Sequence, residues 1–227
     1  KDESAQTSGI PQALPEGEAA AAEQPKLDIM MIGDSVSVRA IPYFKEKFPY
    51  GAIDAAVNRQ LPIGRDVYLA YDQQGIIGKV VVFALGTNGV ATDEQLDQLV
   101  NAVEPDKQVF FVNTRSPQSW VGDTNAALAR AAERYGNVHV IDWHGASAGQ
   151  DGYFDGDGTH LSEEGVRAYI DLVYDAVASL LPAHEEGAEA AKVETPLEAA
   201  TEKAKATVSD TVHGLAHAMT QGMAQQK

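Results

Sequence analysis

The chain has 227 residues, 44% of them hydrophobic, which is enough for one ordinary globular core but not obviously for two. Its 33 acidic and 17 basic residues give a formal net charge of −16, which argues against nucleic acid as a partner, because phosphate binding needs clustered Lys and Arg. The absence of cysteine excludes disulfides, thiolate zinc sites and cysteine nucleophiles.

The two ends of the chain have the composition of segments outside the core. Residues 1–26 are rich in Ala, Glu, Pro and Gln and predict a flexible linker. For residues 184–227, also Ala- and Glu-rich, two interpretations stay open: a disordered tail, or an amphipathic helix at 196–224 that docks on a partner. The chain starts at Lys1 and has no run of about 18 apolar residues, so we expect a piece of a longer protein whose membrane or export elements lie outside it.

Between these ends, apolar runs typical of strands alternate with helical patterns. Strands are predicted at 27–33, 52–57, 79–85, 108–113 and 138–142, and helices at 36–47, 64–74, 92–103, 121–135 and 162–181. The runs KVVVFAL and QVFFVN are continuously apolar, as expected of strands covered on both faces. Residues 27–183 are therefore predicted to form one α/β domain, a three-layer α/β/α sandwich with a five-stranded parallel sheet.

Polar residues follow the predicted strands at the edge where ligands bind in such sheets, beyond the carboxyl ends of the strands. They are Ser35 in MIGDS, Asn58 and Arg59 in AAVNRQ, Asn88 in FALGTNG, and Asp157 and His160 after the fifth strand. A serine, a histidine and an aspartate at one rim are the parts of a nucleophilic acyl-transfer site.

The chemistry gives each of these residues a role. Ser35 is the candidate nucleophile, His160 the base that accepts its proton, and Asp157 the carboxylate that orients and stabilises the imidazole. A lone Gly-Asp-Ser is more often a turn or a helix cap, so the nucleophile assignment depends on Asn88 and His160 being in register. Asp34 is interpreted as structural, orienting the turn.

A tetrahedral intermediate needs hydrogen-bond donors around its oxyanion. We expect the backbone N–H groups of Ser35 and Asn58 and the side-chain amide of Asn88 to supply them. Arg59, Arg115 and Trp120 are candidate substrate-binding residues. For Arg115 and Trp120, in the loop after the fourth strand, a position at the edge of the core is an equal alternative.

The blocks GDS (33–35), GTN (86–88) and DGTH (157–160), in that order, resemble the SGNH or GDSL hydrolase superfamily over about residues 27–182. The sequences VNRQ (57–60) and FVNTRSPQSWVGDTN (111–125) resemble the extracellular catalytic domain that follows a membrane acyltransferase domain in bacterial peptidoglycan O-acetyltransferases. The family's second block usually has glycine where this chain has Asn58. Asparagine can still supply a backbone donor and tolerates left-handed dihedral angles.

This resemblance implies a flavodoxin-like SGNH hydrolase fold and transfer of an acyl group, most simply acetyl, to a cell-wall glycan such as peptidoglycan through an acyl-serine. It also implies an acyl donor and a glycan acceptor as partners, an extracellular position at the cell surface, and a membrane acyltransferase domain in the parent chain. Two alternatives stay open: a secreted carbohydrate or lipid esterase, and an inactive glycan-binding module.

The remaining motifs give weaker indications of function. The DGYFDGDG stretch lacks the pattern of a calcium loop, so we expect no metal and no cofactor. His139, within a predicted strand, and His144 just after it are interpreted as packing or surface residues.

Overall fold

The computed structural model describes residues 26–184, so the predicted linker and the predicted helix at 196–224 lie outside the described residues. No helix within residues 26–184 is long and apolar enough to cross a membrane.

The centre of the domain is a five-stranded sheet in which every strand pair is parallel. The strands are β1 (Leu27–Gly33), β2 (Ala52–Ala55), β3 (Ile77–Ala84), β4 (Gln108–Val112) and β5 (Val138–Ile141). Their order in the sheet is β2-β1-β3-β4-β5. This is the flavodoxin-like order, which confirms the predicted fold class and places the switch point between β1 and β3.

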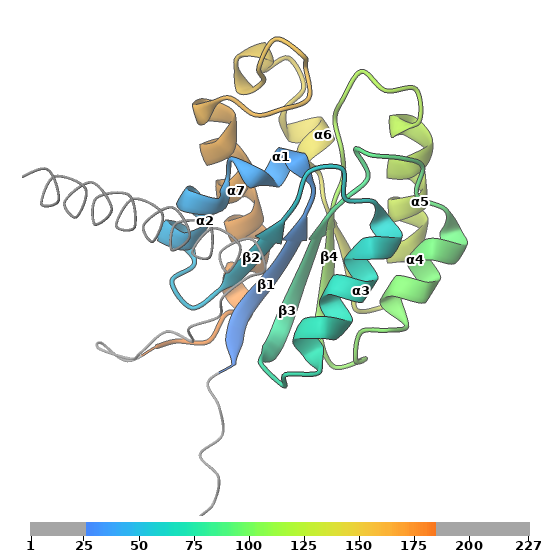
Figure 1. Ribbon diagram of the computed structural model, residues 1–227, viewed down its shortest axis with the longest axis vertical. Coiled ribbons are helices and arrows are strands. Elements are labelled where there is room, and N and C mark those ends of the chain that lie inside the picture. The colour runs from blue at the N-terminus through green and yellow to red at the C-terminus, as the bar shows by residue number, and fades with distance from the viewer. Residues whose placement is uncertain (1–25, 185–227) are drawn as a thin grey trace, which may run out of the picture.

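Helices cover both faces of the sheet (Figure 1). On one face lie α3 (Leu61–Asp72), α4 (Asp93–Val100) and α5 (Val121–Arg134), and on the other α2 (Ile41–Lys47) and α7 (Glu163–Val177). Side chains alternate between two hydrophobic clusters: Met30 belongs to the cluster under α3–α5 and Met31 to the cluster under α2 and α7. Successive side chains of a strand point to opposite faces, so both must be apolar when both faces are covered.

The helix predicted at 36–47 is two helices, α1 (Ser35–Val38) and α2, separated at Arg39 and Ala40. Pro42 explains the break, because its ring would clash with the carbonyl group four residues earlier and it has no N–H to donate to it. Pro instead sits in the first turn of α2, where no donor is needed.

The chain from 143 to 161, for which no element was predicted, folds into α6 (Trp143–Ala146), the 3₁₀ helix η1 (Asp151–Tyr153) and a tight loop before α7. Trp143 packs against the rings of Tyr153, Phe154 and Tyr169, with centroids 5.1 to 5.9 Å apart. This aromatic cluster fixes the segment above the sheet. After α7, a second 3₁₀ helix, η2 (Ala178–Leu180), follows.

The end of the described chain is attached to the domain. His184, which the composition placed in the tail, stacks on the ring of Tyr50 at 3.6 Å between centroids, and its Nε2 lies 2.6 Å from an Asp28 carboxylate oxygen. These contacts lie at the amino end of β1, opposite the predicted ligand edge.

Helix α7 packs so closely on the loop before it that its third residue, Gly165, has no room for a side chain. A Cβ there would lie 1.9 Å from the carbonyl oxygen of Tyr153. We expect Gly165→Ala to lower the free energy of unfolding by about 1–3 kcal/mol, the cost of overpacking. Urea unfolding followed by circular dichroism measures this.

The matched control is Gly122→Ala in α5, where an added Cβ meets nothing within 4 Å. This change should instead raise the free energy of unfolding, by about 0.4–1 kcal/mol, because it reduces the freedom of the unfolded chain. Shifts of the same sign in both variants would contradict the tight contact at Gly165.

Candidate active site

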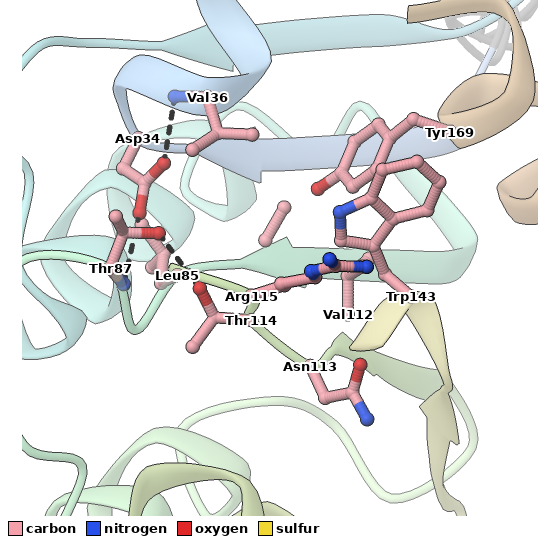
Figure 2. Close-up of a pocket in the computed structure, with 11 residues that line it drawn as sticks. Asp34, Val36, Leu85, Thr87, Val112, Asn113, Thr114, Arg115, Trp143 and Tyr169 are labelled. Carbon is pink, nitrogen blue, oxygen red and sulfur yellow. Dashed lines mark hydrogen bonds between the residues drawn. The ribbon is translucent and has the colours of Figure 1, made fainter. Parts of the chain in front are cut away.

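The turn at the end of β1 is organised by Asp34, which is 1% exposed. Asp34 is the N-cap of α1, and its carboxylate accepts a hydrogen bond from the N–H of Val36 at 3.0 Å. The other carboxylate oxygen accepts from the N–H of Thr87 at 3.4 Å, in the loop after β3. Figure 2 shows Asp34 between these two segments. The predicted structural role of Asp34 is therefore confirmed, and Ser35 is not the cap.

The space behind this turn is too small for a substrate. Asp34, Thr87, Thr114 and Tyr169 line a cavity of about 10 Å³, room for one water molecule at most. Burial raises the pKa of Asp34. Its hydrogen bonds to Val36 and Thr87 act in the opposite direction and stabilise the carboxylate form.

Ser35, His160 and Asp157 form a continuous chain of hydrogen bonds. The Oγ of Ser35 lies 3.0 Å from Nε2 of His160, and Nδ1 of His160 lies 2.6 Å from a carboxylate oxygen of Asp157. The three residues come from the end of β1 and from the loop before α7, 125 positions away. Their geometry is that of a nucleophile, a base and an orienting carboxylate.

The loop before α7 presents Asp157 and His160 together. It closes through a β-bridge between Phe154 and Leu161 and a hydrogen bond from the N–H of Asp155 to the carbonyl group of His160 at 2.7 Å. Gly158 has a φ of 67°, which favours glycine. The chain therefore turns tightly enough for the side chains of Asp157 and His160, three residues apart, to form a hydrogen bond.

Asp157 is held in its charged form. Its pKa is lowered to about 2, first by the hydrogen bond with the His160 side chain and then by the backbone N–H groups of His160 and Thr159, each 2.9 Å away. About half of each side chain is exposed, 51% for Asp157 and 45% for His160, so the pair is open to solvent and to a ligand.

Two of the three predicted oxyanion donors depend on local backbone geometry. Ser35 is the first residue of α1, where the N–H has no partner within the helix. Asn58 has a φ of 60°. It thus occupies the left-handed conformation that asparagine tolerates and glycine prefers.

The third predicted donor, Asn88, lies beside them. Its Nδ2 donates to the carbonyl group of Arg59 at 3.3 Å, which leaves the second amide hydrogen for another acceptor. Ser35, Asn58, Asn88, Asp157 and His160 all line one cleft of about 760 Å³.

Arg59 does not line this cleft. Its side chain is 9% exposed and its guanidinium group donates to the Asp54 carboxylate at 2.7 Å and to the carbonyl groups of Gly33 and Asp54 at 3.1 and 2.6 Å. Asp54 also accepts from the hydroxyl of Tyr71 at 2.9 Å. Arg59 therefore holds the Asn58 loop against β1 and β2, and is not positioned to contact substrate as predicted.

Arg115 and Trp120 also lie outside the residues that line the cleft. The guanidinium group of Arg115 donates to the carbonyl group of Ser147 and lies 4.8 Å from the ring centroid of Phe154. Trp120 is half-buried, and within residues 26–184 its indole N–H has no hydrogen-bond partner. Both fit the alternative of a position at the edge of the core.

Other residues, which sequence reasoning missed, complete the cleft. The loop after β4 contributes Pro117 and Gln118, α1 leads to Arg39, and the loop after β2 contributes Val57, which is 68% exposed. Pro117 and Gln118 lie in the loop NTRSPQSW, so the sequence indicated the correct loop, although within it the predicted contacts were Arg115 and Trp120.

The predicted packing roles of the other histidines fit their contacts. His139 bonds Gln108 at 2.8 Å and stacks on Phe110, and His144 lies 3.2 Å from the carbonyl group of Thr114. Within residues 26–184 no three His, Asp or Glu side chains form a group that could hold a metal ion.

The chain is similar in sequence to bacterial O-acetyltransferases. It is 38% identical over 162 residues to the peptidoglycan O-acetyltransferase OatA of Listeria monocytogenes, and 39% identical over 148 residues to the O-acetyltransferase OatA of Staphylococcus aureus. These matches cover 70% and 63% of this chain but 26% and 24% of the relatives. The chain thus spans about a quarter of the length of the curated relatives it matches. No protein-family model matches the chain.

Solved structures share the fold. The C-terminal catalytic domain of Streptococcus pneumoniae OatA, solved with a methylsulfonyl adduct, superposes with a TM-score of 0.62 at 21% identity, covering 72% of this chain and 99% of that domain. A lipase/acylhydrolase from Enterococcus faecalis gives a TM-score of 0.58 at 17% identity, covering 72% of this chain and all of that one. At these identities the likeness shows the fold alone.

The pH dependence of Ser35 acylation tests the triad. With a pKa of about 2, Asp157 stays ionised above pH 4, so it adds no titration at higher pH. His160 must lose its proton to act as base, so the rate of reaction with an activated acetyl ester should rise with pH through one ionisation. Initial rates from about pH 5 to 8, corrected for hydrolysis without protein, measure this. A flat profile would contradict His160 as base.

The oxyanion donors can be separated by a pair of variants. Asn88→Ala removes a side-chain donor and should lower the rate constant of acylation by about 100- to 1000-fold with little change in ester affinity. Asn58→Gly keeps a backbone donor and a φ that glycine adopts freely, so its rate should stay within a few-fold of the parent. Single-turnover kinetics measures both. Equal losses would assign a role to the Asn58 side chain.

Proposed function

Because the described domain is of the SGNH hydrolase type and similar to peptidoglycan O-acetyltransferases, we propose that it transfers an acetyl group to a hydroxyl of cell-wall peptidoglycan through an ester on Ser35. The observation that carries the proposal is the hydrogen-bonded chain from Ser35 through His160 to Asp157, set in an open cleft. The likeness to the two O-acetyltransferases supports the acyl group and the glycan.

In the first half of the reaction Ser35 attacks the carbonyl carbon of the donor. As the bond from Oγ forms, its proton passes to Nε2 of His160, and the ionised Asp157 stabilises the imidazolium through Nδ1. The negative charge on the carbonyl oxygen is stabilised by the N–H groups of Ser35 and Asn58 and by the Asn88 amide. The leaving group then takes the proton from His160, and the acetyl group remains on Ser35.

In the second half a glycan hydroxyl replaces the leaving group. Nε2 of His160 removes its proton, the hydroxyl oxygen attacks the acetyl carbon, and Ser35 leaves and recovers its proton. Water at roughly 55 M competes for the acetyl group, so a transferase must position its acceptor. The exposed Val57 and the side chains of Pro117 and Gln118 line the cleft beside Ser35, where an acceptor would contact them.

We place this domain at the cell surface, outside the membrane, because its proposed acceptor is there. We further propose that a membrane acyltransferase domain in the parent chain supplies the acetyl group. A secreted esterase would use the same triad and differ in the acceptor alone. An inactive glycan-binding module is disfavoured because it would not need the three residues to be hydrogen-bonded in order.

Intact-mass measurement after incubation with an activated acetyl ester separates these functions. We expect one acetyl adduct on the protein, no adduct on Ser35→Ala, and an unchanged adduct on the control Ser179→Ala, an exposed serine in η2. Adding muramyl glycans or chito-oligosaccharides should discharge the adduct onto the sugar faster than water releases acetate.

Three results would contradict the proposal. If acetate is released and no glycan accelerates loss of the adduct, the domain is an esterase. Glycan binding without any adduct would assign a binding module. Retained activity in Ser35→Ala would remove the assigned nucleophile.

A further inference from the structure

A second cavity opens next to the catalytic cleft, between α2 and α7. It has a volume of about 420 Å³ and is lined by Arg39, Pro42, Tyr43, Glu163, Val166 and Arg167. We call it the α2–α7 groove. Arg39 also lines the catalytic cleft, so the two cavities meet at its side chain. Helices α2 and α7, which contribute residues to the groove, cover the same face of the sheet (Figure 1). Because the groove and the cleft share Arg39, a ligand longer than the cleft can continue into the groove.

The side chain of Arg39 lies where the two cavities meet, and its partners hold it in place. One of its guanidinium nitrogens donates to the Asp155 carboxylate, at 3.1 and 3.0 Å to its two oxygens, and to the carbonyl group of Leu161 at 2.6 Å. The charge of Arg39 is thus balanced by Asp155, and its position is tied to the loop that carries the triad base.

Arg167 is different, because within residues 26–184 it forms no ion pair with a carboxylate. It is exposed, and its guanidinium group lies 5.0 Å from the ring centroid of Tyr43. Asp171, four residues later on the same helix, accepts from the Tyr43 hydroxyl at 3.1 Å and pairs with Lys47 at 2.9 Å. Its pKa is lowered first by the hydrogen bond with Lys47 and only to a smaller extent by the charge of Arg167. In a chain of net charge −16, an arginine that lacks such a partner in a groove is suited to an external anion.

We propose that the α2–α7 groove is an acceptor subsite that binds a carboxylate of the glycan, with Arg167 as the residue that recognises it. The proposal rests on the proposed function, since it concerns the acceptor of the same reaction. A guanidinium group held over an aromatic ring presents a planar set of donors that matches a carboxylate. The carboxylate could belong to the sugar's own acidic substituent or to an attached peptide.

Glu163 supplies an internal check on the sign of the effect. It lines the groove one helical turn before Arg167. Within the described chain, Glu163 forms no ion pair with a lysine or arginine. Its charge should repel an anionic acceptor. Removing it should therefore strengthen binding of a carboxylated glycan, whereas removing the charge of Arg167 should weaken it.

Isothermal titration calorimetry of the full chain tests this with three ligands of equal sugar length: a neutral chito-oligosaccharide, a muramyl glycan with free carboxylates, and the same glycan with attached peptides. We expect Arg167→Gln to weaken binding of the carboxylated ligands about 5- to 10-fold, as for loss of one hydrogen bond of ordinary strength, and Glu163→Gln to strengthen it about 2-fold. Binding of the neutral ligand should not change. Whichever carboxylated ligand loses more affinity identifies the source of the carboxylate.

The control is Arg65→Gln, a partly exposed arginine of α3 on the opposite face of the sheet, where all three affinities should stay as in the parent. An equal effect of Arg167→Gln on neutral and carboxylated ligands, or none on either, would overturn the subsite. Acetylation of Ser35 by the activated ester should be the same in all variants. If Arg167→Gln weakens binding of the carboxylated ligands alone, but the protein transfers acetyl to no glycan, the proposed function is contradicted. The groove would then be a carboxylate-binding site without a transferase function.

Discussion

The geometry of the site depends on the hydrogen bonds that the buried carboxylate of Asp34 accepts. It accepts hydrogen bonds from Val36, just after the nucleophile, and from Thr87, just before Asn88. One side chain thereby connects the segment that carries Ser35 with the segment that carries Asn88, although Asp34 and Thr87 are 53 positions apart in the chain. Burial raises the pKa of this carboxylate, because removing a charge from water costs free energy. The backbone N–H groups of Val36 and Thr87 offset part of that cost, and the same hydrogen bonds align the two segments that carry Ser35 and Asn88.

The other half of the triad depends on packing instead of on a buried charge. The loop that carries Asp157 and His160 is half-exposed, and its own hydrogen bonds make it tight but do not attach it to the sheet. The attachment comes from the aromatic cluster around Trp143, from the close contact of Gly165 with Tyr153, and from Arg39, which donates to Leu161 of the loop. The loop of the candidate base is thus held by apolar packing together with the polar contacts of Arg39, which follows the helix that begins at Ser35. A substitution far from the reacting atoms, such as a larger residue at 165, can therefore displace the base.

The surroundings of the triad fit chemistry on a polar, extended substrate. The catalytic cleft is open and lies at the carboxyl ends of the strands, and the α2–α7 groove lengthens it along the helices of one face. Arginines of the domain serve two distinct purposes. Arg59 and Arg115 are committed to partners within the protein and position loops, whereas Arg167 faces a groove without such a partner. Exposure and pairing separate a structural arginine from one available to a ligand.

The sequence by itself predicted the parallel α/β fold, the strand ends to within about two residues, and the candidate triad Ser35, Asp157 and His160, whose side chains the structure brings into hydrogen-bond contact. It could do so because apolar runs specify strands buried on both faces, and because parallel strands bring their carboxyl ends to one edge whatever the details of packing. It also indicated that Asn58 could tolerate the left-handed backbone that the structure shows there, because this tolerance is a local property of asparagine. Tertiary structure alone decided what the long side chains contact. Arg115 bonds a carbonyl group 32 positions away, and no periodicity in the chain encodes that choice, because the direction of a flexible side chain is set by whichever partners the folded chain places within its reach.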